Sequence, residues 1–405
     1  MEKTKKNKKL VLLSFILIIY AISFRGIHSF YISEIIFLGL FGMKLLELAK
    51  KGNFIIDKKL MFVVYWLYLY ILYLLLNIWQ AANVSEYFTN IIYFLIGIVI
   101  FMVLIFYIRS KKQLITFIKM FTGINVFIAL TTLTMHILFL VTGFKTELVH
   151  VGATVRSVGF YGNPNYYSIS LLLALGMLMG LYSFKLLSNK FMNEINIFLI
   201  SYLILMTGIF LTFSRGALVA GLVVSIIFFA YNMRILMKKN IYIISAIILM
   251  GAVLIIDFRS SHIFLQMYDQ LLLRLENAIY GTGAGRYTIW EEGWLLISSN
   301  WNFFIFGVGG NQFPFYNPHN VHNGYLRFLY EAGVIGVLFF LILLLKLFLN
   351  SFNFKTVKPL SPLFYPLLAF LIMALSNDVF IIKEFWFLVS LVFLWRKLEI
   401  DELKN

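Results

Sequence analysis

The chain of 405 residues contains no cysteine and few charged residues. The absence of cysteine excludes a disulfide framework, a zinc–cysteine site and a thiol nucleophile. Charged residues make up only 13% of the chain, whereas 61% is hydrophobic and 18% is aromatic. A soluble core cannot absorb so much apolar surface, but a polytopic helical membrane protein can. The composition therefore predicts an all-α polytopic membrane protein.

Several motifs that carry catalysis are also missing. There is no Asp-x-Asp, no His-Glu-x-x-His and no Gly-x-Ser-x-Gly. These absences exclude the usual carboxylate cradle for a metal and a nucleotide sugar, a zinc helix and a nucleophile elbow. Gly307-Val308-Gly309-Gly310 is glycine-rich, but no Gly-Lys-Ser/Thr follows it, so we expect a turn. We expect neither a metal nor a cofactor.

The formal net charge of +16 raises the question of nucleic acid or anionic lipid as a partner. The basic residues fall in short clusters between apolar runs rather than along one face, so nucleic acid is not expected. They gather in every second connection, as the positive-inside rule requires when both termini lie in the cytoplasm. The basic opening before residue 10 lacks a following small-residue cleavage site, and it predicts an uncleaved first helix.

Apolar runs of roughly 17–25 residues predict about twelve transmembrane helices in a single integral membrane domain over residues 1–405. The segment 257–324, before the tenth span, is expected to be one long extracytoplasmic loop, and loops of that length are usually functional. A shorter outer loop is expected near 143–164. The spans are expected near 10–24, 28–48, 60–79, 88–108, 114–142, 165–187, 195–212, 216–233, 240–256, 325–346, 361–376 and 382–396.

Two arginines are candidate phosphate ligands. Arg215 interrupts an apolar stretch too long for one helix, and basic clusters near Lys190 and Arg234 flank that stretch, so Arg215 is expected at an outer hairpin tip. A guanidinium there can bind a phosphate through two hydrogen bonds, although an arginine that merely reaches the interface is the alternative. Arg286 lies in the long loop; its alternative is an ion pair with Glu291 or Glu292.

Two histidines, His319 and His322, stand three residues apart just before the tenth span. Asn320 and Asn323 are possible caps for that helix, and an early helix start would place both histidines on one face. Interfacial histidines without a role are the alternative. Inside the fifth span, His136 is expected to be a hydrogen-bonded packing residue. No supporting pattern surrounds His28, His150 or His262.

Two arginines and a histidine on one outer surface suit transfer from a donor whose leaving group is already a diphosphate. The arginines would neutralise the departing anion, and a neutral histidine would take the proton from the attacking hydroxyl.

Four short segments, in this order, resemble the O-antigen ligase/polymerase superfamily of bacterial polysaccharide assembly, over roughly residues 150–345. They are Arg156-Ser157-Val158-Gly159-Phe160-Tyr161-Gly162-Asn163-Pro164-Asn165; Thr212-Phe213-Ser214-Arg215-Gly216; Gly285-Arg286 with Trp290; and His322-Asn323 with Leu326, Leu329, Glu331, Gly333 and Gly336.

The resemblance implies a GT-C-like, metal-independent glycosyltransferase on the outer face of the bacterial cytoplasmic membrane. Its donor and acceptor would be undecaprenyl-diphosphate-linked oligosaccharides held in membrane lipid. Carried over, Arg215 and Arg286 would bind the diphosphate and His322 would be the catalytic base. The secondary candidates are His319, Arg156, Asn163, Asn165, Glu331 and Trp290.

Two activities share these residues. A polymerase for capsule, exopolysaccharide or O-antigen repeat units would move a growing glycan onto the next lipid-linked unit, aided by a chain-length regulator. A ligase would move the finished glycan onto lipid A-core or another surface acceptor. The AT-rich codon signature of Ile, Lys, Asn, Phe and Tyr favours the polymerase. A flippase without chemistry is a third hypothesis, but its ionisable groups should lie near the bilayer midplane.

Overall fold

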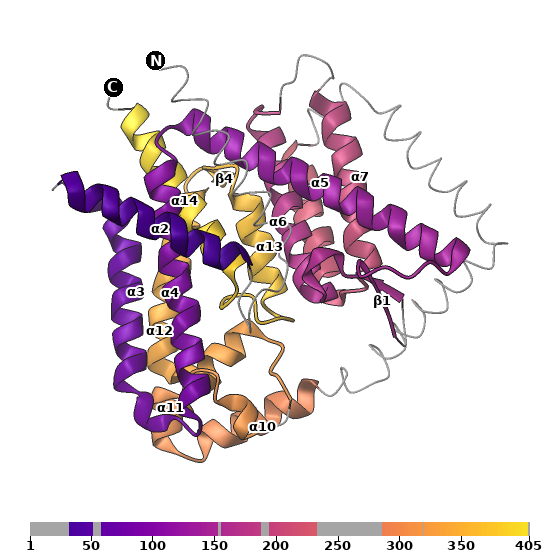
Figure 1. The fold of residues 1–405 in the computed structure, drawn as a ribbon. Coiled ribbons are helices and arrows are strands. Elements are labelled where there is room, and N and C mark those ends of the chain that lie inside the picture. The colour runs from indigo at the N-terminus through magenta and orange to yellow at the C-terminus, as the bar shows by residue number, and fades with distance from the viewer. Residues whose placement is uncertain are drawn as a thin grey trace.

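The computed structural model describes residues 32–51, 58–152, 155–187, 194–232, 286–317 and 319–403. Helices dominate these residues (Figure 1). The longer helices are α2 (Ile32–Lys51), α3 (Lys58–Leu76), α4 (Val84–Tyr107), α5 (Lys111–Thr142), α6 (Pro164–Ser183), α7 (Glu194–Leu211), the helix Arg215–Asn232, α10 (Arg286–Ser298), α11 (Trp301–Phe306), α12 (Gly324–Ser351), α13 (Phe364–Met373) and α14 (Lys383–Glu402).

Short elements fill some of the connections. The 3-10 turns are η1 (Ile78–Gln80), η2 (Gly159–Tyr161) and η4 (Phe313–Phe315). Strand β1 (Val149–Val151) pairs antiparallel with β2 (Val155–Ser157), and β3 (Phe352–Asn353) pairs with β4 (Lys358–Pro359). These two small hairpins are the departure from the predicted all-α fold, and the first occupies the predicted outer loop near 143–164.

Six helices among the described residues are long and apolar enough to cross a membrane. They are α4, α5, α6, α7, Arg215–Asn232 and α12, with shorter apolar helices at Leu60–Leu76 and Phe364–Met373. This confirms a mostly helical polytopic membrane protein. The predicted spans near 10–24 and 240–256, and the loop from 257 to 285, lie outside the described residues, so the number twelve stays a prediction.

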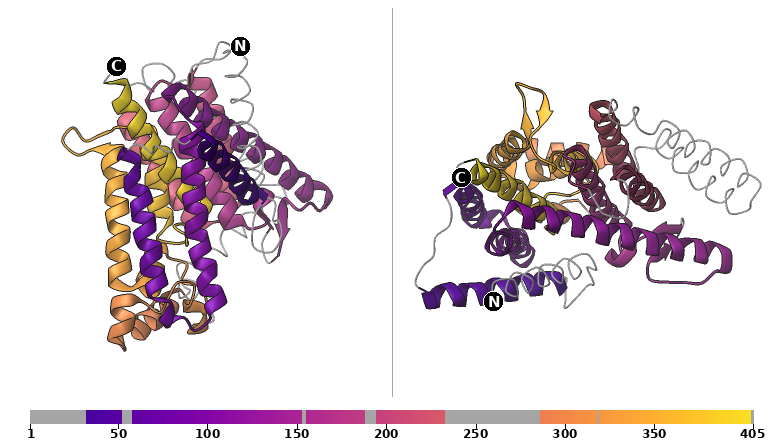
Figure 2. Two further views of the ribbon diagram at one scale, coloured as in Figure 1. Left: turned by 60° about the vertical axis from the view of Figure 1, so that its left-hand side comes forward. Right: turned by 90° about the horizontal axis from the view of Figure 1, so that it is seen from above.

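The helices form two groups joined by α14. Helices α3, α4 and the longer part of α12 run side by side, and α2 lies across them (Figures 1 and 2). Helices α6, α7 and α13 form the second group, and α5 crosses it obliquely. Every residue from Lys383 to Trp395 in α14 is buried, as is every residue from Tyr167 to Leu181 in α6. Because both stretches are mostly apolar on all sides, apart from Lys383 and Glu384 at the start of α14, these two helices form the core.

Helix α12 is broken at Gly333, whose φ of 61° and ψ of −169° are accessible almost only to glycine. The carbonyls just before the break accept hydrogen bonds from outside the helix. The Tyr330 carbonyl accepts from Val308 N (2.8 Å), and that of Glu331 accepts from Gly309 N (3.0 Å). The Ala332 carbonyl accepts from Tyr73 Oη (2.6 Å). The predicted glycine turn at 307–310 is therefore confirmed, and it holds the first half of α12 at a fixed angle.

Candidate active site

Asn323 determines where α12 begins. Its Oδ1 accepts from the backbone nitrogens of Tyr325 (3.0 Å) and Leu326 (3.1 Å), which confirms one of the two predicted caps. The helix starts at Gly324, after both histidines. The early start that would place His319 and His322 on one helical face is therefore not found, because the second asparagine, not the first, caps the helix.

The two histidines lie in different environments. His322 is half-buried and has a left-handed backbone with φ of 50°, which is uncommon outside glycine and often marks a functional site. His319 is exposed, and its backbone nitrogen donates to Asn317 Oδ1 (3.0 Å). The structure therefore distinguishes the pair, and His322 is the one that faces inward.

Helix α10 holds the backbone next to His322. Trp290 Nε1 donates to the carbonyl of Val321 (2.8 Å), and the carbonyl of Trp290 accepts from Tyr330 Oη (2.7 Å). Trp290 thus connects α10, the histidine loop and α12, which is a positioning arrangement rather than contact with a reacting group. On the same helix, Glu292 accepts from Asn317. No ion pair joins Arg286 to Glu291 or Glu292, all three of which the structure describes, so the proposed alternative for Arg286 is not found.

Arg215 follows a tight turn between two helices, as predicted. Helix α7 ends at Leu211, Phe213 takes a left-handed φ of 51°, and the next helix begins at Arg215. Arg156 supports this turn from β2, since its Nε donates to the carbonyl of Thr212 (2.8 Å). A bulky residue at positive φ is a strained conformation, so the turn requires such support.

The remaining secondary candidates of the first motif lie beside Arg156. Its second terminal nitrogen contacts Asn165 Oδ1 at 3.4 Å. Asn163 caps α6 by accepting from the backbone nitrogens of Asn165 (2.8 Å) and Tyr166 (3.4 Å). These three side chains therefore organise the start of α6 and the Arg215 turn.

The loop after α13 joins the two halves of the site. A Cβ on Gly216 would lie 1.7 Å from Ser376 Oγ, so the start of the Arg215 helix touches this loop directly. Gly324 N donates to the carbonyl of Ala374 (2.7 Å), which brings the start of α12 to the same loop. The loop also carries Asp378, whose Oδ2 lies 3.4 Å from a terminal nitrogen of Arg327.

Electrostatic effects connect Arg286 both to Arg215 and to His322. Burial lowers the pKa of the Arg286 guanidinium, the positive charge of Arg215 lowers it further, and Asp378 opposes the change. Burial likewise lowers the pKa of His322 below its ordinary value; Asp378 opposes this, whereas Arg286 and Arg327 reinforce it. The neutral imidazole is therefore favoured, which is the form that accepts a proton.

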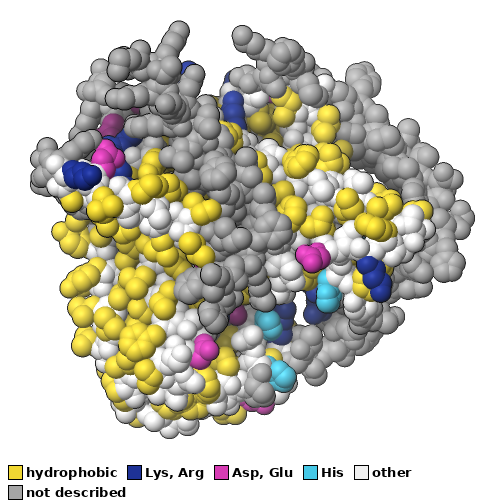
Figure 3. Space-filling view, in the orientation of Figure 1, with side chains coloured by type: hydrophobic (Ala, Val, Ile, Leu, Met, Phe, Trp, Pro, Cys, Tyr) yellow, Lys and Arg dark blue, Asp and Glu magenta, His cyan; other side chains and the backbone are white. Residues whose placement is uncertain are grey.

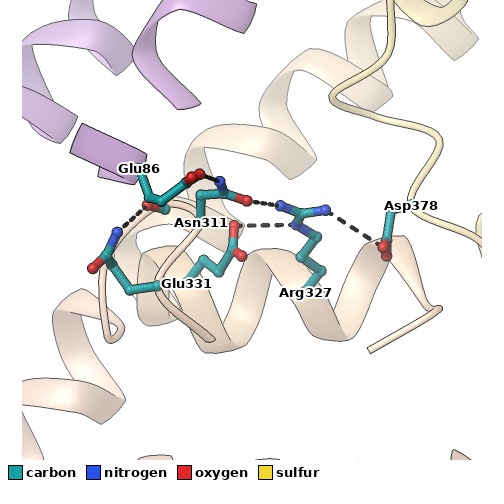
Figure 4. Close-up of polar contacts among 7 residues, drawn as sticks. Glu86, Asn311, Arg327, Glu331 and Asp378 are labelled. Atoms are coloured by element: carbon teal, nitrogen blue, oxygen red, sulfur yellow. Dashed lines mark hydrogen bonds and ion pairs between the residues drawn. The ribbon is translucent and has the colours of Figure 1, made fainter. Parts of the chain in front are cut away.

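A network of charged and polar side chains surrounds Arg327 (Figure 4). Arg327 contacts Glu331 Oε2 (3.2 Å), Asp378 Oδ2 (3.4 Å) and Asn311 Oδ1 (2.9 Å), and Asn311 Nδ2 donates to Glu86 (2.6 Å). Glu331 was predicted as a secondary site residue. Its side chain is 8% exposed and paired with Arg327, so it holds the arginine rather than facing the site.

Arg327 and Asp378 are the site residues that sequence reasoning missed. Asp378 is the sole carboxylate between the eleventh and twelfth predicted spans. A single charged residue in so short a connection could have indicated a site residue. One of its oxygens, Oδ1, is buried and has no hydrogen-bond partner among the described residues. Arg327 was not predicted because it lies in the first turns of a predicted transmembrane helix, where the surrounding residues are mostly apolar.

The described site is predominantly cationic and open to an anion. Within the described part of the chain, Arg215, Arg286 and His322 form no hydrogen bond or ion pair, so their polar atoms are available to a ligand. Histidine and basic side chains gather in the lower middle of the molecule, where its surface is hollowed (Figure 3). No three His, Asp or Glu side chains of the described residues converge on a possible metal position.

The predicted histidine outside this site behaves as expected. His136 of α5 is buried, and its Nδ1 lies 2.9 Å from Ser157 Oγ. His28 and His262 lie outside the described residues, and His150 lies on β1.

Comparison with known proteins finds a family match for part of the chain. Residues 200–341 match the family described as O-antigen ligase. The match includes Arg215, Arg286, Trp290 and His322, and it confirms the resemblance seen in the sequence for this segment. No curated protein matches the chain.

Proposed function

From the match of residues 200–341 to the O-antigen ligase family, we propose that the protein is a polysaccharide polymerase. It would transfer a glycan from undecaprenyl diphosphate to a sugar hydroxyl of another lipid-linked repeat unit. The alternative is the ligase reaction, in which the finished glycan passes to lipid A-core or another surface acceptor. The description of the matching family favours that alternative, and the amino-acid composition favours the polymerase.

One observation carries the proposal. Arg215, Arg286 and His322 come from three distant segments, yet Arg286 interacts electrostatically with both Arg215 and His322, and none of the three forms a hydrogen bond or ion pair with the described residues. The positive charges of Arg215 and Arg286 repel each other, and an anion bound by both would relieve that repulsion. A diphosphate matches this requirement in charge and in hydrogen-bonding geometry.

The chemistry follows from these groups. His322 would take the proton of the acceptor hydroxyl, and the oxygen would attack the anomeric carbon of the donor sugar. A new glycosidic bond forms as the bond to the diphosphate oxygen breaks, and undecaprenyl diphosphate leaves with both bonding electrons. Arg215 and Arg286 would stabilise the negative charge that develops on that oxygen.

The fold supports an active site on the outer face of the membrane. Lys111 at the start of α5 pairs with Glu402 at the end of α14 (2.9 Å), and the C-terminal end of α14 lies at the top of Figure 1. Helices α10 and α11, which precede the histidine loop, lie at the bottom. Because basic residues mark cytoplasmic ends, this arrangement favours a cytoplasmic C-terminus and an outward-facing site.

Alanine variants test the catalytic assignment in cells. Arg215→Ala, Arg286→Ala or His322→Ala should leave the protein inserted in the membrane but abolish long-chain polysaccharide. Arg109→Ala, just after the C-terminal end of α4, is the matched control and should leave the polysaccharide unchanged, since the one hydrogen bond of its side chain among the described residues is from Nε to the carbonyl of Phe106. Normal chain length in the His322→Ala strain would rule out the base assignment.

The glycan ladder of a deletion strain separates polymerase from ligase. Single repeat units on the native acceptor identify a polymerase, because attachment continues without chain growth. Polymer that remains on undecaprenyl diphosphate identifies a ligase, because growth continues without attachment.

A further inference from the structure

The loop between α13 and α14, residues 374–382, lies between two segments that carry candidate catalytic residues. On one side it contacts Gly216, which directly follows Arg215, and on the other it contacts Gly324, two residues after His322. Both contacts are made by glycine, so the loop and the two helix starts approach one another more closely than side chains would allow. The loop is therefore placed to determine how far apart the two segments lie.

The contact at Gly216 leaves no room for a methyl group. A Cβ added there would overlap Ser376 Oγ and lie 2.8 Å from Ser376 Cβ, whereas nonbonded carbons prefer about 3.5–4.0 Å. Ser376 Oγ donates to the carbonyl of Met373 (3.2 Å) and accepts from Asn377 Nδ2 (3.3 Å). Rotating this side chain would break both bonds and would not move Ser376 Cβ, so the helix or the loop would have to shift by roughly 0.7 Å.

The contact at Gly324 is similarly close. A Cβ there would lie 2.9 Å from the ring of Phe380 and 3.3 Å from the carbonyl oxygen of Asn377. Gly324 N also donates to the carbonyl of Ala374 (2.7 Å). Phe380 is 1% exposed and its ring centroid lies 4.4 Å from that of Phe340, so the ring cannot move aside freely. The start of α12 is therefore held against the same loop.

The candidate catalytic residues fall into two groups that meet at this loop. His322 and Arg286 belong together, because Trp290 of α10 donates from Nε1 to the carbonyl of Val321 (2.8 Å). Arg215 belongs to the other group, since the next residue of its helix contacts the loop. A shift of the loop against either group would thus move Arg215 relative to the other two residues.

From these contacts we infer that the loop 374–382 is a spacer that sets the distance from Arg215 to Arg286 and His322, and that Ser376 is its positioning residue. The inference rests on the proposed function. Two arginines bind one diphosphate only at a suitable separation, and the base must reach the acceptor hydroxyl at the same time. A misplacement of about 1 Å can lower a rate by about 10²-fold, so a shift of roughly 0.7 Å should lower kcat by about tenfold or more.

Gly216→Ala tests the spacer, because alanine fits the helical backbone at this position and adds only the Cβ. The two readouts are kcat per folded protein in proteoliposomes, and affinity for inorganic pyrophosphate by calorimetry on the full protein in lipid nanodiscs. Gly216→Ala should lower both by about tenfold or more, because both depend on the separation of the arginines. A purely structural defect would reduce the amount of folded protein but leave both values unchanged.

A compensating variant makes the test specific. Ser376→Gly removes the Cβ and Oγ that the new methyl group would meet, so Gly216→Ala/Ser376→Gly should recover most of the kcat and of the pyrophosphate affinity. Gly221→Ala is the matched control and should behave as wild type, since it lies on the same helix and its Cβ would meet nothing closer than 3.5 Å. Gly324→Ala presses on the loop from the opposite side and should lower both values as Gly216→Ala does.

The outcomes separate the spacer from the proposed function. Wild-type kcat and pyrophosphate affinity in Gly216→Ala, or no recovery on adding Ser376→Gly, overturns the spacer. If Gly216→Ala does not accumulate in the membrane, Gly324→Ala decides by the same two measurements, and wild-type values there overturn the spacer. Absence of pyrophosphate binding by wild type, or retained transfer by Arg215→Ala, overturns the proposed function instead.

Discussion

The hydrogen bond from Trp290 to the histidine loop offers a sharp test of how the site is positioned. Trp290 Nε1 donates to the carbonyl of Val321 at 2.8 Å, immediately before the left-handed backbone of His322. Trp290→Phe removes this donor but keeps an aromatic ring against the small apolar cluster that contains Val321 and Tyr330. The substitution therefore isolates the hydrogen bond from the packing.

The expected magnitude follows from two comparable free energies. Losing a neutral hydrogen bond costs about 0.5–1.5 kcal/mol, and about 1–3 kcal/mol if the carbonyl stays buried and unpaired. A strained left-handed residue costs about 1–3 kcal/mol to maintain. The lost bond is therefore large enough to release His322 from its conformation. Since each 1.36 kcal/mol changes a rate tenfold, kcat should fall on the order of tenfold.

The assay is glycan transfer by purified protein in proteoliposomes, with kcat and KM measured separately. Trp294→Phe is the matched control, because Trp294 lies on the same helix but is 50% exposed. Trp290→Phe should lower kcat and leave KM nearly unchanged, because Trp290 holds the backbone next to the base and does not bind the substrate. The reasoning is refuted if Trp290→Phe and Trp294→Phe have the same kcat, or if only KM changes.

Three other predictions concern the turn, the kink and the titration of the site. Arg156→Ala removes a charged hydrogen bond worth about 1.5–3 kcal/mol, so the rate of transfer should fall about tenfold or more. Arg156→Lys should restore only part of that rate, because lysine lacks the planar guanidinium group. Full activity of the alanine variant would contradict this role. Gly333→Ala would place a Cβ 2.4 Å from the carbonyl oxygen of Ile305 and should lower the thermal unfolding midpoint, whereas Gly123→Ala, with open space around it, should not. Because burial lowers the pKa of His322 below 6.5, the rate of transfer should rise with pH, with a midpoint below 6.5. Asp378→Asn removes the group that raises this pKa, so the midpoint should move to lower pH. A shift to higher pH would contradict the assignment.

Local patterns predicted the features that depend on neighbouring residues. The interruption at Arg215 between two basic clusters predicted the helical hairpin, and Asn323 was recognised as a possible cap. The glycine turn at 307–310 was also predicted, since a cluster of glycines between apolar segments indicates a turn. The sequence signal for each of these features lies in residues close to one another along the chain.

Features that depend on distant residues were not predicted. The break at Gly333 lies inside a continuous apolar run, and it is stable because Val308, Gly309 and Tyr73 satisfy the freed carbonyls. The contact between Arg327 and Asp378 joins residues separated by 51 positions. Hydrophobic periodicity carries no information about which helix ends meet. The start of α12 was left open for a related reason, since Asn320 and Asn323 are equally good caps in sequence.

The central claim is that His322 is the base that activates the acceptor hydroxyl. The most direct measurement is single-turnover transfer by purified His322→Ala and His319→Ala proteins, because the chain itself provides a second histidine three residues away. Loss of a general base typically lowers the rate by about 10²–10⁴-fold. The account predicts that loss for His322→Ala and a rate near wild type for His319→Ala, whose side chain is exposed. A wild-type rate for His322→Ala, or the larger loss for His319→Ala, would contradict it.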